Sequence, residues 1–584
     1  MTDRIGPFSY HVHAPRLPAL EDGREPRRHR VAIAGGGPVG LSMALALARW
    51  GVASVVLEAD DSVCVGSRAI CISRRSLEIL EQLGALQPHL DKGLPWEGGR
   101  TFHGTDEILH FTMPHDENQK LPPMINIQQY WIEQFLVEAA SRHADLIDIR
   151  WGSELVGFEQ HEGADAGVTL QARCAGTDYA MQADWMIACD GGQSFVRKRL
   201  GLKLEGTGFE GKYVIVDITL PSTYPTERRA WFDPPSNPGS TVLMHKQPDD
   251  LWRLDYQIPD DADMDEALRP ENVAAFVRRH LEMLGEAHLP WQIVWISAYR
   301  AGAMTLERYR HGRILFAGNA AHAMPIFGVR GLNSGFDDAF NLGWKLASVL
   351  RGWAGPQLLD TYDAERLHAF RVNAASAIKS TEFMAPPSRG FALMREAALT
   401  LSHRHPAIAQ LANPRQTSVI DYDDSPLNAA SDALSGGPAP GAALPECPVR
   451  GPAPIGHLTD VVGAHWTALV FGADGGLAPA TDASLRRLEG AQVPFRTVIV
   501  AAAGEPESHG ARMRVVDDTG RAAALYGASG AADAADAVIY LVRPDGHIAG
   551  RWTSPAAADR LAETLAGTLA GTPAPASAAL PMHA

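Results

Sequence analysis

The sequence has few cysteines and no long apolar run, and these shortages exclude several classes of protein. Five cysteines occur in 584 residues, with no CxxC pair and no metal-like spacing, so we expect neither a disulfide framework nor a metal site. No apolar stretch of about twenty residues is free of glycine or charge, which argues against a membrane-spanning helix. Residues 1–30 lack the apolar core of a signal peptide. We therefore expect a cytoplasmic protein with reduced thiols and no membrane partner.

Positive charge is also in short supply. The chain has 52 lysines and arginines against 68 aspartates and glutamates, a formal net charge of −16. Because phosphate backbones are bound through clustered basic side chains, this balance argues against nucleic acid as a partner. Apolar residues make up 46% of the chain, which supports sizeable cores, and the length predicts about three domains.

A glycine-rich segment near the N-terminus gives the first positive indication of function. An apolar stretch over residues 31–34 is followed by GGGPVG and then by an apolar helical pattern, as in a strand, tight turn and helix. Such a turn lets a pyrophosphate rest on the helix N-terminus, a role that falls to Gly35, Gly37, Pro38 and Gly40. A second predicted strand ends at Glu58, at the offset where an acidic residue accepts hydrogen bonds from an adenosine ribose. The segment predicts a site for FAD or NAD, and a chance turn in a glycine-rich chain is the alternative interpretation.

Two later segments decide which dinucleotide is expected. One is an apolar stretch over residues 185–189 that leads into DGGQSFVR at 190–197. The other runs from an apolar stretch at 313–317 through GNAAH at 318–322 and PIFGVRGLN at 325–333 into a helical pattern. Both resemble the signature segments of the class A flavoprotein aromatic hydroxylases, which have the p-hydroxybenzoate hydroxylase fold. The resemblance covers nearly the whole chain after residue 30 and identifies FAD as the expected cofactor.

The resemblance also implies roles for single residues in an FAD cradle. Besides the first glycine segment and Glu58, it implies contacts to the cofactor from Arg68, Gln129, Asp190, Gly191, Arg197, Gly318, Asn319, Pro325, Gly331, Leu332 and Asn333. In the family, the helix that begins near position 331 points its N-terminal amides at the flavin, where the reduced ring carries negative charge. His322 is expected to be a structural hydrogen-bonding residue. An ordinary helix cap is the alternative for Asp190, and a capping or exposed role is the alternative for Gln129.

The chain departs from the family pattern at Asn319, where the family normally has aspartate. An asparagine side chain still accepts a hydrogen bond through its carbonyl oxygen but brings no charge, so we expect FAD to bind more weakly. Only one GxGxxG segment is present, which fits a family without a separate nicotinamide domain. NADH or NADPH is then the expected co-substrate, and O2 the expected oxidant.

Residues 206–294 predict an inserted antiparallel substrate-binding sheet. Apolar and polar residues alternate in three segments, a Pro-Asp-Asp turn lies at 248–250, and a helix is expected over 270–284. The alternation places positions 243 and 245 on one face and 244 on the other. Hydroxylation of a phenol needs a base, a proton path or a cation near the substrate oxygen, so we expect His245, Arg253 and Tyr256 to contact the substrate. A solvated His245 and a Tyr256 in the core are the alternatives.

The predicted organisation is an α/β protein with a Rossmann-like (GR2-type) FAD-binding domain over residues 31–205 and 295–400. Residues 1–30 are expected to form a flexible arm, and the Pro-, Gly- and Ala-rich stretch within 401–444 a linker. The tail at 445–570, with strand patterns at 465–471, 496–500 and 537–552, resembles the thioredoxin-like C-terminal domain of phenol-type hydroxylases without a CxxC. It is expected to serve packing or a homodimer contact, and residues 571–584 are expected to be disordered.

The resemblance implies an FAD-dependent monooxygenase that uses NAD(P)H and O2 to hydroxylate a small phenolic substrate. The implied chemistry is oxygen addition at flavin C4a and hydroxyl transfer from the hydroperoxyflavin to the ring. Within the family, the length and tail most resemble 3-(3-hydroxyphenyl)propionate hydroxylases and phenol hydroxylases. The alternatives are a flavin-dependent oxidase or dehydrogenase with the same cradle, an aromatic polyketide hydroxylase, and an FAD-binding regulatory protein without activity.

Overall fold

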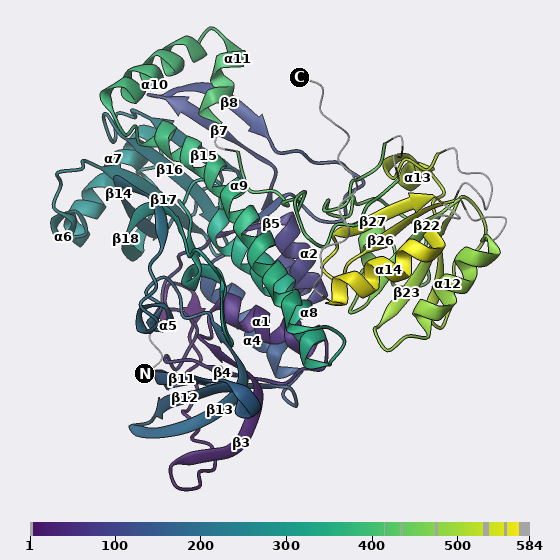
Figure 1. The fold of residues 1–584 in the computed structure, drawn as a ribbon. Helices are drawn as coiled ribbons and strands as arrows, with labels where there is room; N and C mark the ends of the chain where they lie inside the picture. The colour runs from purple at the N-terminus through teal and green to yellow at the C-terminus, as the bar shows by residue number, and fades with distance from the viewer. Residues whose placement is uncertain are drawn as a thin grey trace.

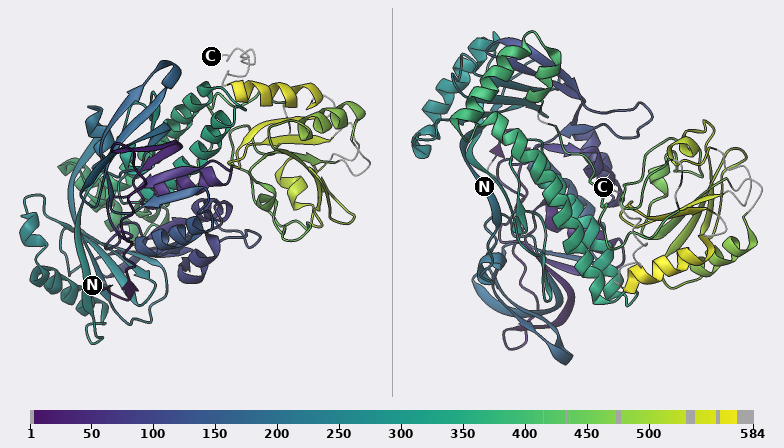
Figure 2. Two further views of the ribbon diagram at one scale, coloured as in Figure 1. Left: turned by 90° about the horizontal axis from the view of Figure 1, so that it is seen from below. Right: turned by 45° about the horizontal axis from the view of Figure 1, so that its top comes forward.

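The computed structural model describes residues 4–413, 415–432, 434, 436–472, 477–529, 537–553 and 557–570. These residues form two eight-stranded sheets and a six-stranded sheet close to the C-terminus. The C-terminal sheet and its helices form a lobe of their own, and α8 (Arg330–Leu350) and α9 (Asp360–Met384) lie between this lobe and the two larger sheets (Figures 1 and 2). The predicted disordered tail, 571–584, lies outside the described residues.

The first sheet has a parallel core built from the apolar segments that precede the glycine motifs. β3 (Arg24–Ala34) pairs in parallel with β4 (Ser54–Leu57) and β13 (Thr177–Ala188), and β13 pairs in parallel with β20 (Ile314–Phe316). β10 (Ile147–Arg150) extends this core by a parallel pairing with β4. Antiparallel pairings add β12 (Gly167–Cys174), β11 (Ser153–His161) and β19 (Arg310–His311). The three glycine segments therefore follow the carboxyl ends of neighbouring parallel strands, where open α/β sheets bind their ligands.

Helices cover this sheet because its parallel strands are apolar on both faces. α1 (Pro38–Ala48) is buried along nearly its whole length and contacts both α4 (Gln129–Ser141) and α8. The shorter helices of this region are α2 (Arg74–Gln82), α3 (Leu86–Lys92) and α5 (Phe195–Arg199). A small sheet beside them contains β5 (Cys71–Ser73), β9 (Met124–Asn126) and β6 (Leu94–Trp96).

The second sheet contains the predicted substrate-binding strands and extends beyond residues 206–294. Its order is β21-β18-β14-β17-β16-β15-β7-β8. The bounds are β7 (Gly98–His103), β8 (Asp106–Thr112), β14 (Glu205–Thr219), β15 (Arg228–Phe232), β16 (Thr241–Gln247), β17 (Leu251–Ile258), β18 (Gln292–Thr305) and β21 (His322–Ala323). The helix expected over 270–284 is α7 (Pro270–Leu284). The predicted boundaries were too narrow because β7 and β8 come from earlier in the chain and pair through a parallel contact with β15, which strand alternation cannot reveal.

Within the segment predicted as a flexible arm, parts of residues 4–30 form strands or pack against other elements. Residues 24–30 belong to β3, and two short strands, β1 (Arg4–Ile5) and β2 (Phe8–Ser9), precede it. Phe8 and Tyr10 are buried, and Phe8 packs against the rings of Tyr130 and Trp131 on α4. The apolar aromatic residues thus fix a segment whose overall composition is polar.

The C-terminal lobe is a mixed sheet with helices. Its order is β24-β25-β23-β22-β26-β27, and β22 (Trp466–Phe471) pairs in parallel with β23 (Phe495–Ala501) and antiparallel with β26 (Val538–Val542). The other elements are β24 (Glu507–His509), β25 (Arg512–Val516), β27 (Ile548–Thr553), α12 (Pro479–Glu489), α13 (Arg521–Leu525) and α14 (Ala557–Ala570). These strands confirm the predicted α/β tail; the thioredoxin-like assignment stays a prediction.

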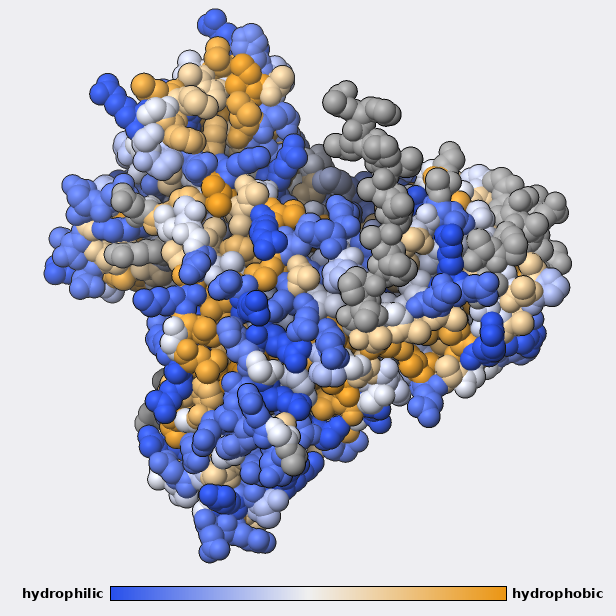
Figure 3. Space-filling view, in the orientation of Figure 1, coloured by the Kyte–Doolittle hydropathy of each residue, from blue (hydrophilic) through white to orange (hydrophobic). Residues whose placement is uncertain are grey.

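The segment predicted as a linker, 401–444, is packed against the rest of the chain in several places. It contains the end of α10 (Arg389–Ser402), α11 (Pro406–Ala409) and the buried side chains of Tyr422 and Leu427. The surface over α10 is apolar (Figure 3), with Leu393 and Met394 among its exposed side chains. In the part of the chain that the structure describes, every helix is too short or too polar to cross a membrane.

Candidate cofactor and substrate site

The first glycine segment has the geometry of a dinucleotide loop. Gly35 has a φ of 99°, and an added Cβ would lie 2.5 Å from the backbone oxygen of Cys189, so this turn requires glycine. A Cβ at Gly40 would lie 1.9 Å from the Gly35 oxygen, which lets α1 pack directly on the turn. Gly37 caps α1 and Pro38 begins it, and apart from the chain neighbours no described residue lies within 4 Å of a Cβ added at Gly37. The helix N-terminus is therefore left open for an anionic group.

Glu58 lies beside this loop, as predicted from its spacing. Its Oε2 accepts a hydrogen bond from the Gly36 amide at 2.5 Å, and its Oε1 accepts one from the Asp60 amide at 2.9 Å. Burial raises the pKa of the Glu58 carboxyl. The carboxylate stands at the end of β4, next to the turn where a ribose would lie.

The second and third segments are tied together by Arg197. The Arg197 guanidinium donates to the backbone oxygens of Ala320 (2.9 Å) and Gly192 (2.5 Å). The Asp190 carboxylate accepts from the Ser194 hydroxyl (2.6 Å) and the Val196 amide (3.0 Å), which is the helix-cap alternative for this residue. Both side chains thus bind protein groups, and a Cβ added at Gly191 would meet no described atom within 4 Å.

In the third segment the Asn319 side chain is exposed, whereas its neighbours form hydrogen bonds within the protein. Gly318 has a φ of 60°, and its amide donates to Asp338 Oδ2 at 2.9 Å. His322 Nε2 is 2.7 Å from the same oxygen, and Arg366 Nε donates to Asp338 Oδ1 at 2.7 Å. The expected structural role of His322 is confirmed by this contact. Burial raises the pKa of the Asp338 carboxyl, but the neighbouring His322 and Arg366 outweigh burial and lower it below its usual value. Asp338 and Arg366 are supports of the cradle that were not among the predicted residues.

Arg68 and Gln129 lie close together beside the cradle but differ in their contacts. The Gln129 side chain accepts from the Ala69 amide at 3.1 Å and donates to Glu133 Oε1 at 2.9 Å. The Gln129 amide donates to the Ser67 hydroxyl at 2.9 Å, which fixes the start of α4. The Arg68 side chain is exposed and lies free of protein hydrogen bonds among the described residues. Arg68 is therefore available to a ligand, whereas Gln129 is engaged by the protein.

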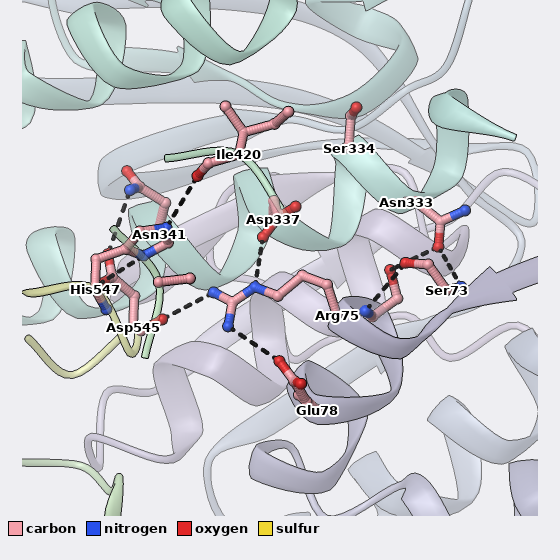
Figure 4. Close-up of polar contacts among 12 residues, drawn as sticks. Ser73, Arg75, Glu78, Asn333, Ser334, Asp337, Asn341, Ile420, Asp545 and His547 are labelled. Carbon is pink, nitrogen blue, oxygen red and sulfur yellow. Dashed lines mark hydrogen bonds and ion pairs between the residues drawn. The ribbon is translucent and has the colours of Figure 1, made fainter. Parts of the chain in front are cut away.

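α8 begins at Arg330, one residue before the predicted position, and its first turn carries no side-chain cap. Nothing lies within 4 Å of a Cβ at Gly331, Leu332 is half-buried, and Pro325 is buried in the preceding loop. Asn333 Oδ1 accepts from the Ser73 amide (2.9 Å) and the Ser76 hydroxyl (2.7 Å), as Figure 4 shows in part. Asn333 is thus a link between α8 and α2, while the amides of the first turn remain open to a ligand.

A polar chain runs from this helix to the C-terminal lobe (Figure 4). Arg75 of α2 donates to Asp337 Oδ1 at 3.1 Å and to the backbone oxygen of Asp545 at 2.8 Å. The Asp545 carboxylate accepts from Trp344 Nε1 at 2.9 Å and from Arg543 at 2.5 Å. The turn between β26 and β27 is therefore anchored on α8.

Cross-strand register places four charged or titratable residues in one row of the second sheet. Arg228, His245, Arg253 and Asp217 are successive partners on β15, β16, β17 and β14. Because side chains alternate along strands, all four point to the same face, which we call the inner face. Arg253 on this face donates to the backbone oxygens of Ser67 and Arg68, so the inner face is turned toward the FAD cradle.

The structure corrects two of the three predicted substrate contacts. Arg253 is buried and forms a bidentate ion pair with Asp217, at 2.7 and 2.8 Å, so its charge is already compensated. Tyr256 points to the opposite, outer face, where its ring stacks on Phe276 of α7 at 3.7 Å. The tyrosine is therefore in the core, and the arginine is a structural link. Sequence alternation could not say which face a helix would cover.

His245 keeps its predicted position on the inner face and is joined there by groups that the sequence analysis missed. Burial, with the positive charges of Arg228 and Arg253, holds the pKa of the His245 imidazole well below its usual value. Burial also raises the pKa of Asp255 to about 7. Four side chains on this face have a buried polar atom without a hydrogen-bond partner among the described residues: Arg228 Nη1, His245 Nδ1, Asp255 Oδ1 and both amide atoms of Gln247.

Comparison with known proteins places this geometry in a family. The family model described as FAD binding domain matches residues 28–376. A 3-(3-hydroxy-phenyl)propionate/3-hydroxycinnamic acid hydroxylase of Shigella sonnei (strain Ss046) is 30% identical over 380 residues, which are 65% of this chain and 66% of that protein. The match thus spans slightly less than two thirds of the relative.

Two solved structures are similar over most of the chain. The flavin-dependent monooxygenase PieE, in complex with FAD and substrate, has a TM-score of 0.74 and 25% identity, and the match covers 93% of this chain and 99% of that one. Aklavinone-11 hydroxylase, in a complex with FAD and aklavinone, has a TM-score of 0.71 and 25% identity with the same coverage. The chain belongs to the family whose model is described as FAD binding domain, and FAD is its cofactor.

Proposed function

We propose that the protein is a monooxygenase that uses FAD, NADH or NADPH, and O2 to hydroxylate a phenolic ring. The observation that carries the proposal is the set of unpartnered polar atoms on the inner face. Buried polar groups are nearly always hydrogen-bonded, so a cluster of exceptions turned toward a cofactor cradle marks where a polar substrate binds. Relatives named as hydroxylases and monooxygenases support the same conclusion.

Two inner-face groups are suited to take the phenol proton. His245 is neutral at pH 7 because its pKa is lowered, and its unpartnered Nδ1 can accept a hydrogen bond from the phenol. Asp255, with a pKa of about 7, is close to the value that favours proton transfer near neutral pH. The nearby charge of Arg228 favours the phenolate form of the substrate.

FAD, when bound, supplies the activated oxygen, and the protein positions the ring and excludes water. The open N-terminus of α1 suits the pyrophosphate, the first turn of α8 suits the flavin ring, and Asn319 is free to face the ribityl chain. Leu243 and Ala230 are buried on the inner face beside the polar groups and offer an apolar surface to an aromatic ring.

A single-ring phenol such as 3-(3-hydroxyphenyl)propionate is the substrate that we favour. The support is the Shigella sonnei relative, whose name contains this compound. A polycyclic aromatic polyketide is the second candidate, because aklavinone-11 hydroxylase matches 93% of the chain, including much of the C-terminal lobe. The choice between NADH and NADPH, the homodimer and the cytoplasmic location stay predictions.

The test is aerobic NADH and NADPH oxidation by the FAD-loaded protein, with and without a phenol panel and aklavinone, under ¹⁸O2. We expect one class of compound to stimulate oxidation and to gain one ¹⁸O atom by mass spectrometry. Stimulated oxidation with peroxide but without ¹⁸O gain for every compound would contradict the proposal and favour an oxidase. Stimulation by aklavinone alone would select the polyketide candidate.

A further inference from the structure

α10 presents an apolar face to solvent. Seven of the eleven large apolar side chains that are exposed in the described part of the chain lie within residues 372–419. Three of them, Leu393 (61% exposed), Met394 (71%) and Leu401 (45%), follow one another along α10 at helical spacing. A surface helix normally turns polar side chains outward. The outer face of α10 is therefore an exposed apolar ridge, which we call the α10 ridge.

The opposite face of α10 holds the helix on the second sheet. Leu399 is buried in one cluster with Ala230 and Leu243 of the inner face. The half-buried Arg395 donates to the backbone oxygen of Met384 at the end of α9. Because these contacts already fix the helix, the side chains of the α10 ridge are not needed to hold α10 in place.

The segment that carries the α10 ridge is also rich in positive charge. Residues 371–419 contain six lysines or arginines against two glutamates, whereas the whole chain has a formal net charge of −16. Five of these basic side chains are exposed and form no hydrogen bond or ion pair with the described residues: Arg371, Lys379, Arg389, Arg404 and Arg415. Unpaired cations beside an apolar ridge favour an external partner with negative charge.

A groove beside the α10 ridge combines the two features. It has a volume of 530 Å³ and lies between α9 and the segment that follows α11. Its lining includes the apolar side chains of Val372, Phe383 and Leu411 together with the cations of Lys379 and Arg415. The described residues that line it include no carboxylate. An apolar groove with cations alone suits an amphipathic molecule that has an anionic end.

The α10 ridge lies at the outer edge of the molecule. α10 and α11 pack on each other and form the top edge in Figure 1, away from the C-terminal lobe. Apolar side chains gather on the surface there in Figure 3. A ridge in this position can meet an extended surface without obstruction by the C-terminal lobe.

We propose that the α10 ridge and the basic side chains of residues 371–419 dock the protein onto an anionic lipid surface. In this arrangement Leu393, Met394 and Leu401 enter the boundary between headgroups and acyl chains, and the cations meet the lipid phosphates. The stems of the long basic side chains lie along apolar surface while their charged ends reach the headgroups. The expectation of no membrane partner rested on the lack of a spanning helix, and an interfacial helix spans nothing.

A second copy of the chain fits the α10 ridge less well. A two-fold interface places the same patch of each copy against the other, so it would bring like charges together. A head-to-tail contact would avoid this repulsion but would extend into an open filament unless the rotation closed a ring. An anionic lipid surface satisfies both the apolar side chains and the cations.

The experiment measures flotation of the FAD-loaded protein with lipid vesicles in a density gradient. Vesicles of phosphatidylcholine alone are compared with vesicles of phosphatidylcholine and phosphatidylglycerol in equal parts. We expect binding to the anionic vesicles to be at least about 10-fold tighter, because each basic side chain near a charged leaflet contributes about fivefold to affinity. Added salt should weaken it. A protein that stays at the bottom of the gradient with anionic vesicles would overturn the proposal.

Two double variants test the apolar ridge and the cations separately. Leu393→Gln/Met394→Gln should weaken binding to anionic vesicles at least about 10-fold, because two apolar side chains no longer leave water. Arg389→Gln/Arg404→Gln, which removes a cation at each end of α10, should weaken it about 10- to 30-fold and reduce its salt dependence. Binding as tight as wild type in both variants would overturn docking through α10.

Arg27→Gln/Arg487→Gln is the matched control, because it removes two exposed cations from β3 and α12. It should bind anionic vesicles within about twofold of wild type, since charges far beyond a Debye length from the lipid are screened. A loss equal to that of Arg389→Gln/Arg404→Gln would show that overall charge is responsible, and would overturn the proposal. All these positions are exposed, so the melting temperatures should agree within about 2 °C.

Sedimentation without lipid tests the second copy as the occupant. We expect Leu393→Gln/Met394→Gln to leave the association state of the wild type unchanged. A wild-type dimer that dissociates in this variant would identify the α10 ridge as an interface between copies and overturn the proposal. Neither measurement uses a substrate, so the outcome is independent of the proposed reaction.

Discussion

Glu365 and Arg366 are neighbours on α9 whose side chains hold two different parts of the molecule. Glu365 accepts from Arg543 of the C-terminal lobe at 2.5 and 2.9 Å and from Lys345 of α8 at 2.6 Å. Arg366 donates to Asp338, which in turn accepts from the Gly318 amide of the FAD cradle. One turn of one helix thus connects the cofactor site with the C-terminal lobe.

Glu365→Gln should destabilise the protein strongly. The substitution leaves two buried cations, Lys345 and Arg543, with only the Asp545 carboxylate between them. Removal of one partner from a buried ion pair typically costs about 3–5 kcal/mol. Urea unfolding of the FAD-loaded protein measures this. Asp424→Asn, which removes an exposed carboxylate paired with the half-buried His368, is the control and should change the free energy of unfolding by less than about 0.5 kcal/mol.

Asp338→Asn should weaken FAD binding. The carboxylate receives three donors, from Gly318, His322 and Arg366, and an amide would present its own donors to at least one of them. We expect the dissociation constant for FAD, from flavin fluorescence, to rise about 10-fold or more. Asp360→Asn, which removes an exposed carboxylate paired with Arg310 at the start of α9, should leave it unchanged. An unaltered affinity in Asp338→Asn would show that the loop holds its shape without this carboxylate.

Tyr256→Phe should leave the Michaelis constant for the substrate unchanged. The tyrosine stacks on Phe276 on the outer face, away from the groups that we assign to substrate binding. The phenylalanine ring keeps this stacking, so stability should change by less than about 1 kcal/mol. His245→Asn, on the inner face, should by contrast alter both kcat and its pH dependence. Equal losses in the two variants would place Tyr256 back in the substrate site.

Asp255→Asn should make stability less dependent on pH. The pKa of Asp255 is raised from 3.8 to about 7 in the folded state, so the folded state holds its proton more tightly than the unfolded state. Wild-type stability therefore falls as pH rises from about 4 to about 7 and then levels off. The stability advantage of the asparagine variant should grow by about 3 kcal/mol between pH 5 and pH 8. Urea unfolding at the two pH values measures it, and a constant difference would contradict the raised pKa.

Asn319→Asp should tighten FAD binding. The side chain is exposed at the mouth of the cradle, and a carboxylate accepts stronger hydrogen bonds from ribityl hydroxyls than an amide does. We expect the dissociation constant to fall by up to about 10-fold, measured by flavin fluorescence during titration of the apoprotein. Asn319→Ala should raise it. If the alanine and aspartate variants bound FAD with the same dissociation constant, residue 319 would not face the cofactor.

Local patterns predicted the strands and the cofactor segments well. Each of these patterns depends on a few adjacent residues: the glycine turns, the apolar stretches before them and the period-two alternation of β16 and β17. The structure confirms these elements. The predicted helix over 270–284 is confirmed for the same reason. The position of Glu58 beside Gly36 follows from strand lengths and the parallel pairing of β3 with β4.

The substrate residues were harder to predict because their roles depend on distant partners. Arg253 is separated in sequence from both Asp217 and Ser67, so no local pattern shows that its charge is compensated. Arg228 was not predicted because nothing in its own segment distinguishes it from Arg229; only the sheet register and the aromatic rings around Arg229 do. Alternation defines two faces of a strand, and the packing of helices decides which one meets the cofactor.

The turn at residues 543–547 has a consequence for how this protein can be engineered. It inserts Arg543 and Asp545, both fully buried, between α8 and α9. A chain cut before β22, or a chimaera with a foreign C-terminal lobe, would leave Lys345 and Glu365 facing water or an unmatched surface. The C-terminal lobe should therefore be exchanged together with the cofactor domain. The residues of α8 and α9 that contact this turn are then transferred with the lobe.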